Sequence, residues 1–252
     1  MEEFYLPSNG AGRIHCALWS PETAPRAVVQ IIHGIAEYVP RYAGFAAFLN
    51  ARGFLVTGED HMGHGKSHGT EPCHFSGGWC AAVDDSMELL RRTQRDYPGV
   101  PYFVLGHSMG SFLTRTLLFR YPDAGLRAAV ICGTGWQPAP VLAAGLALCG
   151  LEKLRLGETG RSKLLANLMF GAYNRKFPDA RTPNDWICSD PEVVAKYTAD
   201  PLCGQDATIG LTREMLRGIR MIQRPANLQR MDKALPVFFI AGRSDPVGNM
   251  GR

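Results

Sequence analysis

Residues 102–110 read YFVLGHSMG, and this stretch decides the fold class. Four apolar residues lead into Gly106-His107-Ser108-Met109-Gly110, a Gly-x-Ser-x-Gly motif, and apolar residues then recur at helical spacing as far as Phe119. The glycines two residues either side of Ser108 permit a turn that is too tight for Cβ atoms. The sequence therefore predicts a buried strand that passes directly into a helix, with Ser108 exposed at the turn.

Short apolar runs alternate with amphipathic stretches on both sides of this motif. Further strands are predicted at residues 27–33, 54–57, 127–132 and 237–241, and helices at 42–52, 79–97 and 108–119. The helix at 42–52 is expected to carry its apolar face on Phe45, Phe48 and Leu49. Two opening runs, 3–7 and 13–19, flank the turn dipeptide Asn9-Gly10 and predict a hairpin. This alternation is typical of an α/β domain, a mostly parallel sheet with helices on both faces.

The rhythm of strands and helices stops between residues 133 and 211. Pro-rich and Gly-rich pieces alternate there with short helices such as 163–170, and no strand is evident. A helical stretch at 211–231, interrupted near Pro225, leads back to the strand at 237–241. We therefore expect one large domain with an insertion: a first core part at 1–132, a helical insertion at 133–211 and a second core part at 212–252.

Composition excludes several classes of protein. Hydrophobic residues make up 46% and charged residues 20% of the 252 residues, which rules out a disordered or fibrous chain. The net charge is only +4 and the basic residues are scattered, so nucleic acid is not an expected partner. No apolar run is long enough to cross a bilayer, and the N-terminus has no secretory signature. Seven cysteines without a Cys-x-x-Cys pair indicate reduced thiols and a cytoplasmic location.

The residues after the strand at 27–32 are expected to lie beside Ser108. His33-Gly34-Ile35-Ala36-Glu37 follows that strand, and the carboxyl ends of parallel strands meet at one edge of a sheet. The backbone N–H groups of Ile35 and Met109 are our candidates for an oxyanion hole, which stabilises a tetrahedral oxyanion with preorganised amides. The side chains expected around the substrate are those of His33, Gly34, Glu37 and His107, although His33 alone also fits an ordinary turn histidine.

A candidate acid follows the last predicted strand. Asp245 lies four residues after the strand at 237–241, downstream of Ser108, in the order that a Ser, acid and His triad takes in this kind of sheet. Its role would be to orient a histidine and to stabilise the imidazolium ion. On its own, an aspartate before Pro246 is equally well explained as a turn residue.

Four stretches together resemble one family. VVQIIHGIAEYVPRY (28–42), EDHMGHGKSHG (59–69), QRDYPGVPYFVLGHSMGS (94–111) and VFFIAGRSDPVGNMG (237–251) are similar to the monoacylglycerol lipase and lysophospholipase group of α/β-hydrolases, the serine aminopeptidase S33 family. The resemblance covers the chain from about residue 26 to its end. It implies an α/β-hydrolase fold in which 133–211 forms the cap, with Ser108 as nucleophile, Asp245 as acid, and Ile35 and Met109 as oxyanion amides.

The sequence departs from this family at one point. The resemblance implies a catalytic histidine a few tens of residues after the acid, beyond one further strand, whereas Arg252 follows Asp245 by seven residues. We therefore expect a shortened hydrolase that lacks its last strand, its last helix and its general base, with weak or absent hydrolysis. The strand at 237–241 would then be an exposed apolar edge that favours homodimers or aggregates, which light scattering would detect.

A cluster of histidines and a cysteine raises the question of a metal site. His61, His64, His68, Cys73 and His74 lie within fourteen residues, but their spacing matches no standard zinc site. A glycine-rich turn explains the stretch better. Gly65-Lys66-Ser67 resembles the end of a phosphate-binding loop, yet Asp60 occupies the position of its first glycine. No metal and no cofactor is therefore expected.

The insertion carries apolar helical stripes, which include Leu168 and Met169. Cap helices that pack on the core would explain them, and so would an acyl-chain pocket over Ser108 or transient contact with a membrane or micelle surface. If they line an acyl pocket, replacing Leu168 and Met169 with charged residues is expected to impair binding of long-chain esters more than short-chain esters. An equal loss on both, measured with p-nitrophenyl esters, would count against the pocket.

These observations favour a serine hydrolase that cleaves lipid-type carboxylic esters, such as monoacylglycerols or lysophospholipids, through an acyl-enzyme on Ser108. The partner expected is a small-molecule acyl ester. Two alternatives stay open. One is an S33-type aminopeptidase or a thioesterase; a peptidase would be favoured if the acidic cap residues Asp179, Asp185, Asp190 and Glu192 hold a substrate amine. The other is a non-catalytic fragment that binds an apolar ligand.

Overall fold

The computed structural model describes residues 1–67 and 71–248 and contains a seven-stranded sheet. Its strands are β1 (Glu2–Pro7), β2 (Arg13–Trp19), β3 (Ala27–Ile32), β4 (Phe54–Glu59), β5 (Tyr102–His107), β6 (Leu126–Cys132) and β7 (Val237–Ile240). They lie in the order β1-β2-β4-β3-β5-β6-β7. The sheet is parallel from β4 to β7, and β1 and β2 form the predicted antiparallel hairpin at one edge. The predicted α/β class is confirmed.

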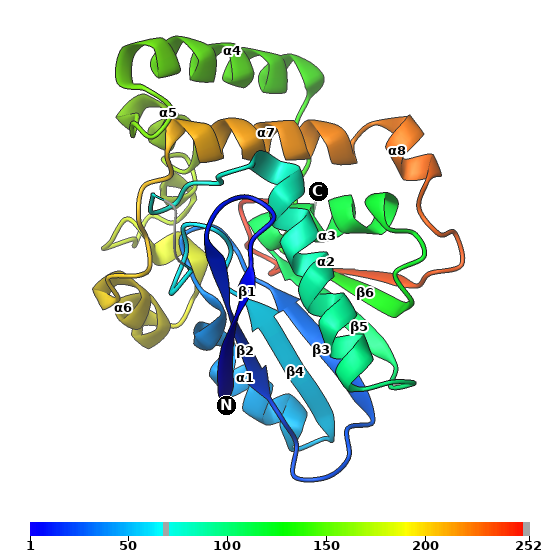
Figure 1. The fold of residues 1–252 in the computed structure, drawn as a ribbon. Helices are drawn as coiled ribbons and strands as arrows, with labels where there is room; N and C mark the ends of the chain where they lie inside the picture. The colour runs from blue at the N-terminus through cyan, green and yellow to red at the C-terminus, as the bar shows by residue number, and fades with distance from the viewer. Residues whose placement is uncertain (68–70, 249–252) are drawn as a thin grey trace.

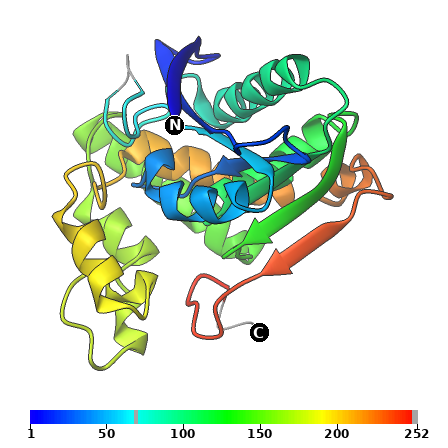
Figure 2. The same ribbon diagram turned by 90° about the horizontal axis from the view of Figure 1, so that it is seen from below.

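Helices cover both faces of this sheet, as expected. On one face α2 (Gly78–Asp96) and α3 (Met109–Arg120) bury the main core with strand residues such as Val28, Leu55 and Val104. On the other face α1 (Ala43–Asn50), preceded by a 3-10 turn at Val39–Tyr42, covers a smaller core that includes Ile31 and Val56. Successive strand residues thus point to opposite faces, each of which is apolar, as in a parallel sheet buried on both sides. Figures 1 and 2 show the two layers of helices with the sheet between them.

Helix α1 differs from its prediction in which side it buries. Phe45 and Phe48 are exposed and stack on each other with ring centroids 6.3 Å apart, and the Arg52 guanidinium lies over the Phe48 ring. The small Ala46 is fully buried instead, and Leu49 packs partly against the smaller core. The prediction was wrong for the two phenylalanines because α1 turns Ala46, and not Phe45 or Phe48, toward the smaller core.

The segment 133–211 contains helices and turns and no strand. It includes α4 (Ala139–Leu156), α5 (Lys163–Met169), 3-10 turns at Asn174–Lys176 and Asp185–Ile187, and α6 (Pro191–Ala199). Helix α7 (Ile209–Ile222) then returns to the core and packs against α4, and a short α8 (Pro225–Gln229) leads to β7. Figure 1 shows α4 and α7 side by side over one end of the molecule. Among the helices of the described residues, none has the length and apolarity needed to cross a membrane.

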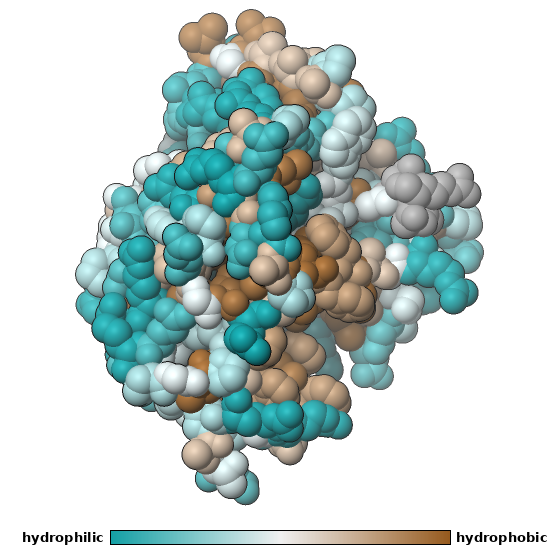
Figure 3. All heavy atoms as spheres, turned by 90° about the vertical axis from the view of Figure 1, so that its right-hand side faces the viewer, coloured by the Kyte–Doolittle hydropathy of each residue, from teal (hydrophilic) through white to brown (hydrophobic). Residues whose placement is uncertain are grey.

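The strand β7 lies at the open edge of the sheet. It pairs with β6 on one side, and its side chains Phe238, Phe239 and Ile240 are 61%, 59% and 47% exposed. Because neighbouring residues of a strand point to opposite faces, both faces of β7 are uncovered. Figure 2 shows β7 as the outermost strand, and Figure 3 shows apolar atoms gathered on that side of the molecule. An uncovered parallel edge of this kind is a surface for pairing with another strand.

Candidate active site

Ser108 lies in the turn between β5 and α3, and its backbone is strained. Its φ of 51° and ψ of −119° are rare for a residue with a side chain. A Cβ on Gly106 would lie 2.1 Å from Thr114 Oγ1, and a Cβ on Gly110 would lie 1.9 Å from the carbonyl oxygen of Ile32. Both glycines of the motif are therefore required by close packing, which supports the predicted elbow.

Backbone hydrogen bonds hold the Ser108 turn on both sides. The Ser108 N–H donates to the Cys132 carbonyl over 2.9 Å. The Ser108 carbonyl accepts from the Ser111 N–H at 2.9 Å and from the Ser111 hydroxyl at 2.5 Å. In the described part of the chain the Ser108 hydroxyl itself has no hydrogen-bond partner. The turn is thus rigid, while the oxygen that it presents is free to react.

The loop after β3 reaches Ser108, as the sequence predicted. A Cβ on Gly34 would lie 3.2 Å from Ser108 Cβ, so only a glycine lets the two backbones come this close. Neither the Ile35 N–H nor the Met109 N–H donates to an acceptor within residues 1–67 and 71–248. Met109 is the first residue of α3, where the N–H groups lie at the positive end of the helix dipole. These two donors have the properties required of an oxyanion hole.

Two residues of the segment 133–211 fix the conformation of this loop. Ala36 has a left-handed φ of 52°, and its carbonyl accepts from the Tyr197 hydroxyl at 3.0 Å and from the Gly204 N–H at 2.9 Å. Both donors lie in or just after α6. This contact could not be predicted from the sequence, since no motif connects Ala36 with Tyr197 or Gly204, which lie 161 and 168 positions further along the chain.

Glu37 is the centre of a buried polar network next to Ser108. Its Oε1 accepts from the Gly34 N–H at 2.7 Å and from the Tyr42 hydroxyl at 2.9 Å, and it lies 3.0 Å from His107 Nδ1. Its Oε2 is paired with the Arg41 guanidinium. A cavity of about 180 Å³ lies beside this network and is lined by Glu37, Arg41, Tyr42 and His107. Arg41 and Tyr42 were not predicted as site residues; both lie in the 3-10 turn Val39–Tyr42, which begins two residues after Glu37.

The Glu37 and His107 pair stabilises the charged form of both partners. Burial alone would raise the pKa of Glu37, but the hydrogen bond and charge of His107, with the charge of Arg41, outweigh burial and hold this pKa below its ordinary value. Burial likewise opposes protonation of His107, yet the hydrogen bond and charge of Glu37 raise the pKa of His107 above its ordinary value. His107 therefore holds a proton at pH values where a free histidine has lost it.

This pair predicts a pH dependence of stability. Since the pKa of His107 is raised in the folded state, its contribution is fully present below the unfolded value near 6.5 and is lost as pH rises through the folded value. The free energy of unfolding of the His107→Asn variant, measured by urea denaturation, is expected to fall less than that of the wild type from about pH 6 to pH 9. Parallel curves for the two proteins would refute a stabilising charge on His107.

Asp245 lies in the loop after β7, on the same edge of the sheet. Its Oδ1 accepts from the Val247 N–H at 2.8 Å, which fixes the carboxylate. Its Oδ2 lies 3.2 Å from the position that a Cβ on Gly133 would take, and His107 Nε2 lies 3.8 Å from the same point. The charge of Asp245 also helps to raise the pKa of His107. The structure thus brings together Ser108, Gly34, Glu37, His107 and Asp245.

Three predicted substrate-contacting residues lie in other environments. His33 is fully buried; its Nδ1 bonds to the Gly34 carbonyl at 2.7 Å and its Nε2 accepts from the His61 N–H at 2.9 Å, so it supports two loops. Burial lowers the pKa of His33. Leu168 is 64% exposed at the end of α5, and Met169 packs partly against the main core.

The histidine-rich turn is also buried. His61 and His64 are buried, and His68 lies outside the described residues. Within the described ranges, no group of three or more histidine, cysteine or acidic side chains is arranged to hold a metal ion.

Comparisons with known proteins show the family to which the chain belongs. Residues 23–252 match the model of the family described as serine aminopeptidase, S33. The chain is 33% identical over 242 residues to the monoacylglycerol lipase of Mycolicibacterium smegmatis, covering 94% of this chain and 76% of the relative. It is 36% identical over 237 residues to the monoglyceride lipase of Mus musculus, covering 92% and 69%. The crystal structure of a thermostable carboxyl esterase from Bacillus coagulans in complex with glycerol superimposes with a TM-score of 0.88 at 28% identity, covering 100% of this chain and 82% of that one.

Proposed function

Because the chain belongs to the serine aminopeptidase S33 family, within the monoacylglycerol lipase group of α/β-hydrolases, we propose that it cleaves lipid-type carboxylic esters through an acyl-enzyme on Ser108. Monoacylglycerols and lysophospholipids are the substrates that we propose. One observation carries the assignment of the nucleophile: within residues 1–67 and 71–248, the Ser108 hydroxyl on its strained turn and the backbone N–H groups of Ile35 and Met109 have no hydrogen-bond partner. This arrangement supports attack on a carbonyl and stabilisation of the oxyanion that forms.

The proposed reaction runs in two steps. Ser108 Oγ attacks the ester carbonyl while a base takes its proton, and the Ile35 and Met109 N–H groups bind the oxyanion. The tetrahedral intermediate collapses, the alcohol leaves with a proton, and water releases the fatty acid in the second step. Asp245 is proposed to orient the base. Because no histidine of the described residues hydrogen-bonds to Ser108, we propose that hydrolysis by this chain is weak or absent unless a base is supplied.

The polar cavity next to Ser108 supports an ester of a polyhydric alcohol. Glu37, Arg41, Tyr42 and His107 present donors and acceptors there, whereas an acyl chain requires an apolar surface. The related esterase from Bacillus coagulans was crystallised in complex with glycerol. We propose that the alcohol part of the substrate binds in this cavity, and that the acyl chain lies against the apolar cap, where Leu168 and Met169 contribute.

The cap and the sheet edge also carry apolar residues on the surface. Leu151, Leu154, Leu164 and Leu168 on α4 and α5 are each about half exposed or more. We propose that this cap surface makes transient contact with a membrane or micelle, from which lipid esters are taken. The exposed β7 supports homodimers formed by edge pairing.

The cap proposed here is the segment 133–211, between the core parts 1–132 and 212–252. The cysteines within the described ranges are free, which supports a reducing, cytoplasmic location.

An aminopeptidase would need free carboxylates in the cap to hold a substrate amine. Two of the four candidates are already engaged by the backbone: Asp185 accepts from the Thr182 N–H at 2.9 Å, and Asp190 caps α6 by accepting from the Glu192 N–H at 2.9 Å. These local bonds favour a structural role. The geometry therefore supports an ester substrate better than a peptide.

Fluorophosphonate labelling tests the proposal. With imidazole present as a base, the wild type is expected to become covalently labelled and to hydrolyse p-nitrophenyl butyrate, and Ser108→Ala is expected to lose both. Ser189→Ala, which removes an exposed hydroxyl in the cap, serves as the matched control and is expected to behave as the wild type. Labelling of Ser108→Ala at the wild-type level would place the nucleophile elsewhere and overturn the proposal.

A further inference from the structure

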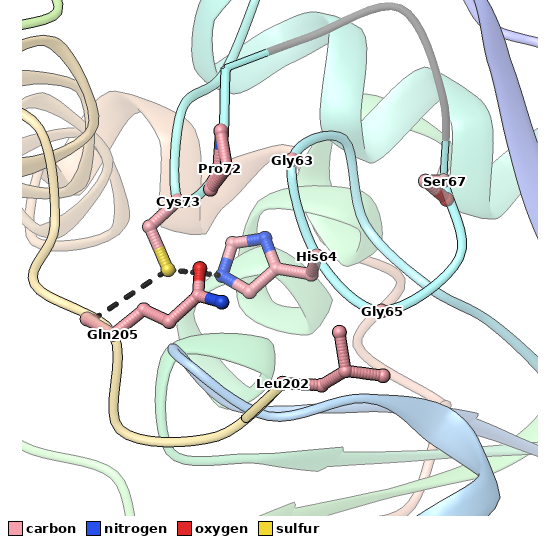
Figure 4. A pocket seen from close by; sticks show the side chains of 8 residues that line it. All are labelled: Gly63, His64, Gly65, Ser67, Pro72, Cys73, Leu202 and Gln205. Atoms are coloured by element: carbon pink, nitrogen blue, oxygen red, sulfur yellow. Dashed lines mark hydrogen bonds between the residues drawn. The ribbon is translucent and has the colours of Figure 1, made fainter. Parts of the chain in front are cut away.

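A second cavity, of about 100 Å³, lies between the histidine-rich turn and the cap. The cavity is lined by the turn at residues 63–65, by Pro72 and Cys73, which follow that turn in the chain, and by Leu202 and Gln205 of the cap. The mechanism above uses none of these groups. Figure 4 shows the Cys73 thiol and the His64 ring directed at each other in this cavity.

His64 presents an unshared electron pair to the cavity. Its ring is buried, and its Nδ1 lies 3.0 Å from the carbonyl oxygen of Met62. A carbonyl only accepts hydrogen bonds, so Nδ1 carries the proton and Nε2 does not. Burial lowers the pKa of His64, which keeps the ring neutral. The hydrogen-bond partner of Nε2 is Cys73 Sγ, 3.9 Å away.

Cys73 cannot satisfy both acceptors that face it. Its sulfur lies 3.9 Å from His64 Nε2 and 3.7 Å from the Gln205 carbonyl oxygen, and a thiol has one proton. Burial raises the pKa of Cys73 to about 12, so the thiol is protonated and unreactive while no cation replaces the proton. One buried acceptor is therefore always left with a poor partner.

The backbone holds Cys73 in this position. Its φ is left-handed at 49°, its N–H donates to the Gly63 carbonyl at 2.7 Å, and its carbonyl accepts from the Thr208 N–H and hydroxyl, each at 3.1 Å. A strained residue that is fixed by bonds to two other segments is a preorganised one. The sulfur and the imidazole are thus fixed relative to each other before any ligand binds.

We propose that Cys73 and His64 bind one soft monovalent cation of the Cu⁺ class between Sγ and Nε2. A metal ion with bonds of about 2.3 Å to sulfur and about 2.0 Å to nitrogen spans at most about 4.3 Å, so the separation of 3.9 Å admits one ion with a bent arrangement. Thiolate and imidazole are the ligands that select soft metals.

Charge and ligand number decide the class of cation. The thiolate balances a single positive charge, so the buried site stays neutral once the ion is bound. Among the described residues no carboxylate lines the cavity, which disfavours Mg²⁺ and Ca²⁺, and two side-chain ligands are fewer than structural Zn²⁺ requires. On binding, the Cys73 S–H bond breaks, a sulfur–metal bond forms, and the proton passes to water. No change of oxidation state is involved.

Silver(I) is the probe for this site, because it is soft and monovalent and is not oxidised under assay conditions. Titration of the intact chain with Ag⁺ in the presence of excess glutathione, followed by native mass spectrometry, is expected to give one retained ion per chain. Cys73→Ser and His64→Gln are each expected to weaken binding by about 100-fold or more. Cys188→Ser, which removes a partly exposed thiol that faces no histidine, is the matched control and should bind as the wild type does.

A second measurement separates loss of the site from loss of the fold. With glutathione in excess to compete for the thiols of the unfolded chain, Ag⁺ is expected to raise the melting temperature of the wild type and of Cys188→Ser and to leave that of Cys73→Ser unchanged. X-ray absorption at the silver edge of the wild type is expected to show both sulfur and nitrogen neighbours. Retention of one Ag⁺ by Cys73→Ser, or a sulfur-only spectrum in the wild type, would overturn the proposal. None of these readouts depends on ester hydrolysis, so they stand apart from the proposed function.

Discussion

Dissolved imidazole is expected to accelerate ester hydrolysis by this protein about tenfold, and only when Ser108 is present. A positioned general base contributes roughly 10²–10⁴-fold to such reactions, and a base that diffuses in from solution recovers part of this. The space next to Ser108 and Asp245 is where it would act. The measurement is the rate of p-nitrophenyl butyrate hydrolysis against imidazole concentration, corrected for the reaction without protein.

The control for this experiment is Ser108→Ala, and the comparison must be made at each imidazole concentration. Residues that act as a unit contribute non-additively, so without a base the removal of Ser108 lowers the rate only slightly. The difference between the two proteins is therefore expected to appear as imidazole is added. A wild type that turns over rapidly without imidazole would place the base within the chain. An equal response of both proteins would exclude Ser108 as the nucleophile.

Gly110→Ala is expected to destabilise the fold by about 3 kcal/mol or more. The new Cβ would lie 1.9 Å from the Ile32 carbonyl oxygen and 2.5 Å from that of His33. Both are backbone atoms of β3 and its loop, so they cannot turn away as a flexible side chain does. For a chain of this length the loss corresponds to a melting temperature roughly 6–12 °C lower.

Gly150→Ala is the matched control for this substitution. Gly150 lies within α4 with nothing within 4 Å of its Cβ position, so alanine there is expected to be neutral or to stabilise by about 0.5–1 kcal/mol. Differential scanning calorimetry of both variants makes the comparison. If Gly110→Ala has the same melting temperature as Gly150→Ala, the elbow does not pack closely on β3.

The sequence allowed the strands and the elbow to be predicted because they depend on short-range patterns. Apolar runs such as residues 102–105 are buried on both faces wherever they pair in a parallel sheet, and the glycines around Ser108 leave few alternative turns. Burial within α1 could not be predicted in the same way. Phe45 and Ala46 are adjacent and both apolar, and the rotation of the helix about its axis decides which of them faces the sheet.

The sequence predicts only those residues of the candidate site that belong to a recognisable motif or follow a predicted strand. Ser108, Glu37 and Asp245 each follow a strand, and the shared edge of the sheet brings them together. The tie from Tyr197 to the Ala36 carbonyl depends on how the cap folds over the core, which no local pattern encodes. The buried state of His33 depends likewise on the loop of His61, which supplies its partner.

The contact between the proposed cap and Ala36 couples the position of the cap to the shape of the loop that carries Ile35. Tyr197 and Gly204 donate hydrogen bonds to the Ala36 carbonyl, one residue after the N–H of Ile35 that we propose as an oxyanion donor. Displacement of this part of the proposed cap is therefore expected to disturb the loop. A ligand that leaves the cap displaced would meet a poorly formed oxyanion site and react slowly, however tightly it binds. Substrates would then differ more in kcat than in KM. Water or a short alcohol that reaches the serine without seating the cap would meet an incomplete oxyanion site.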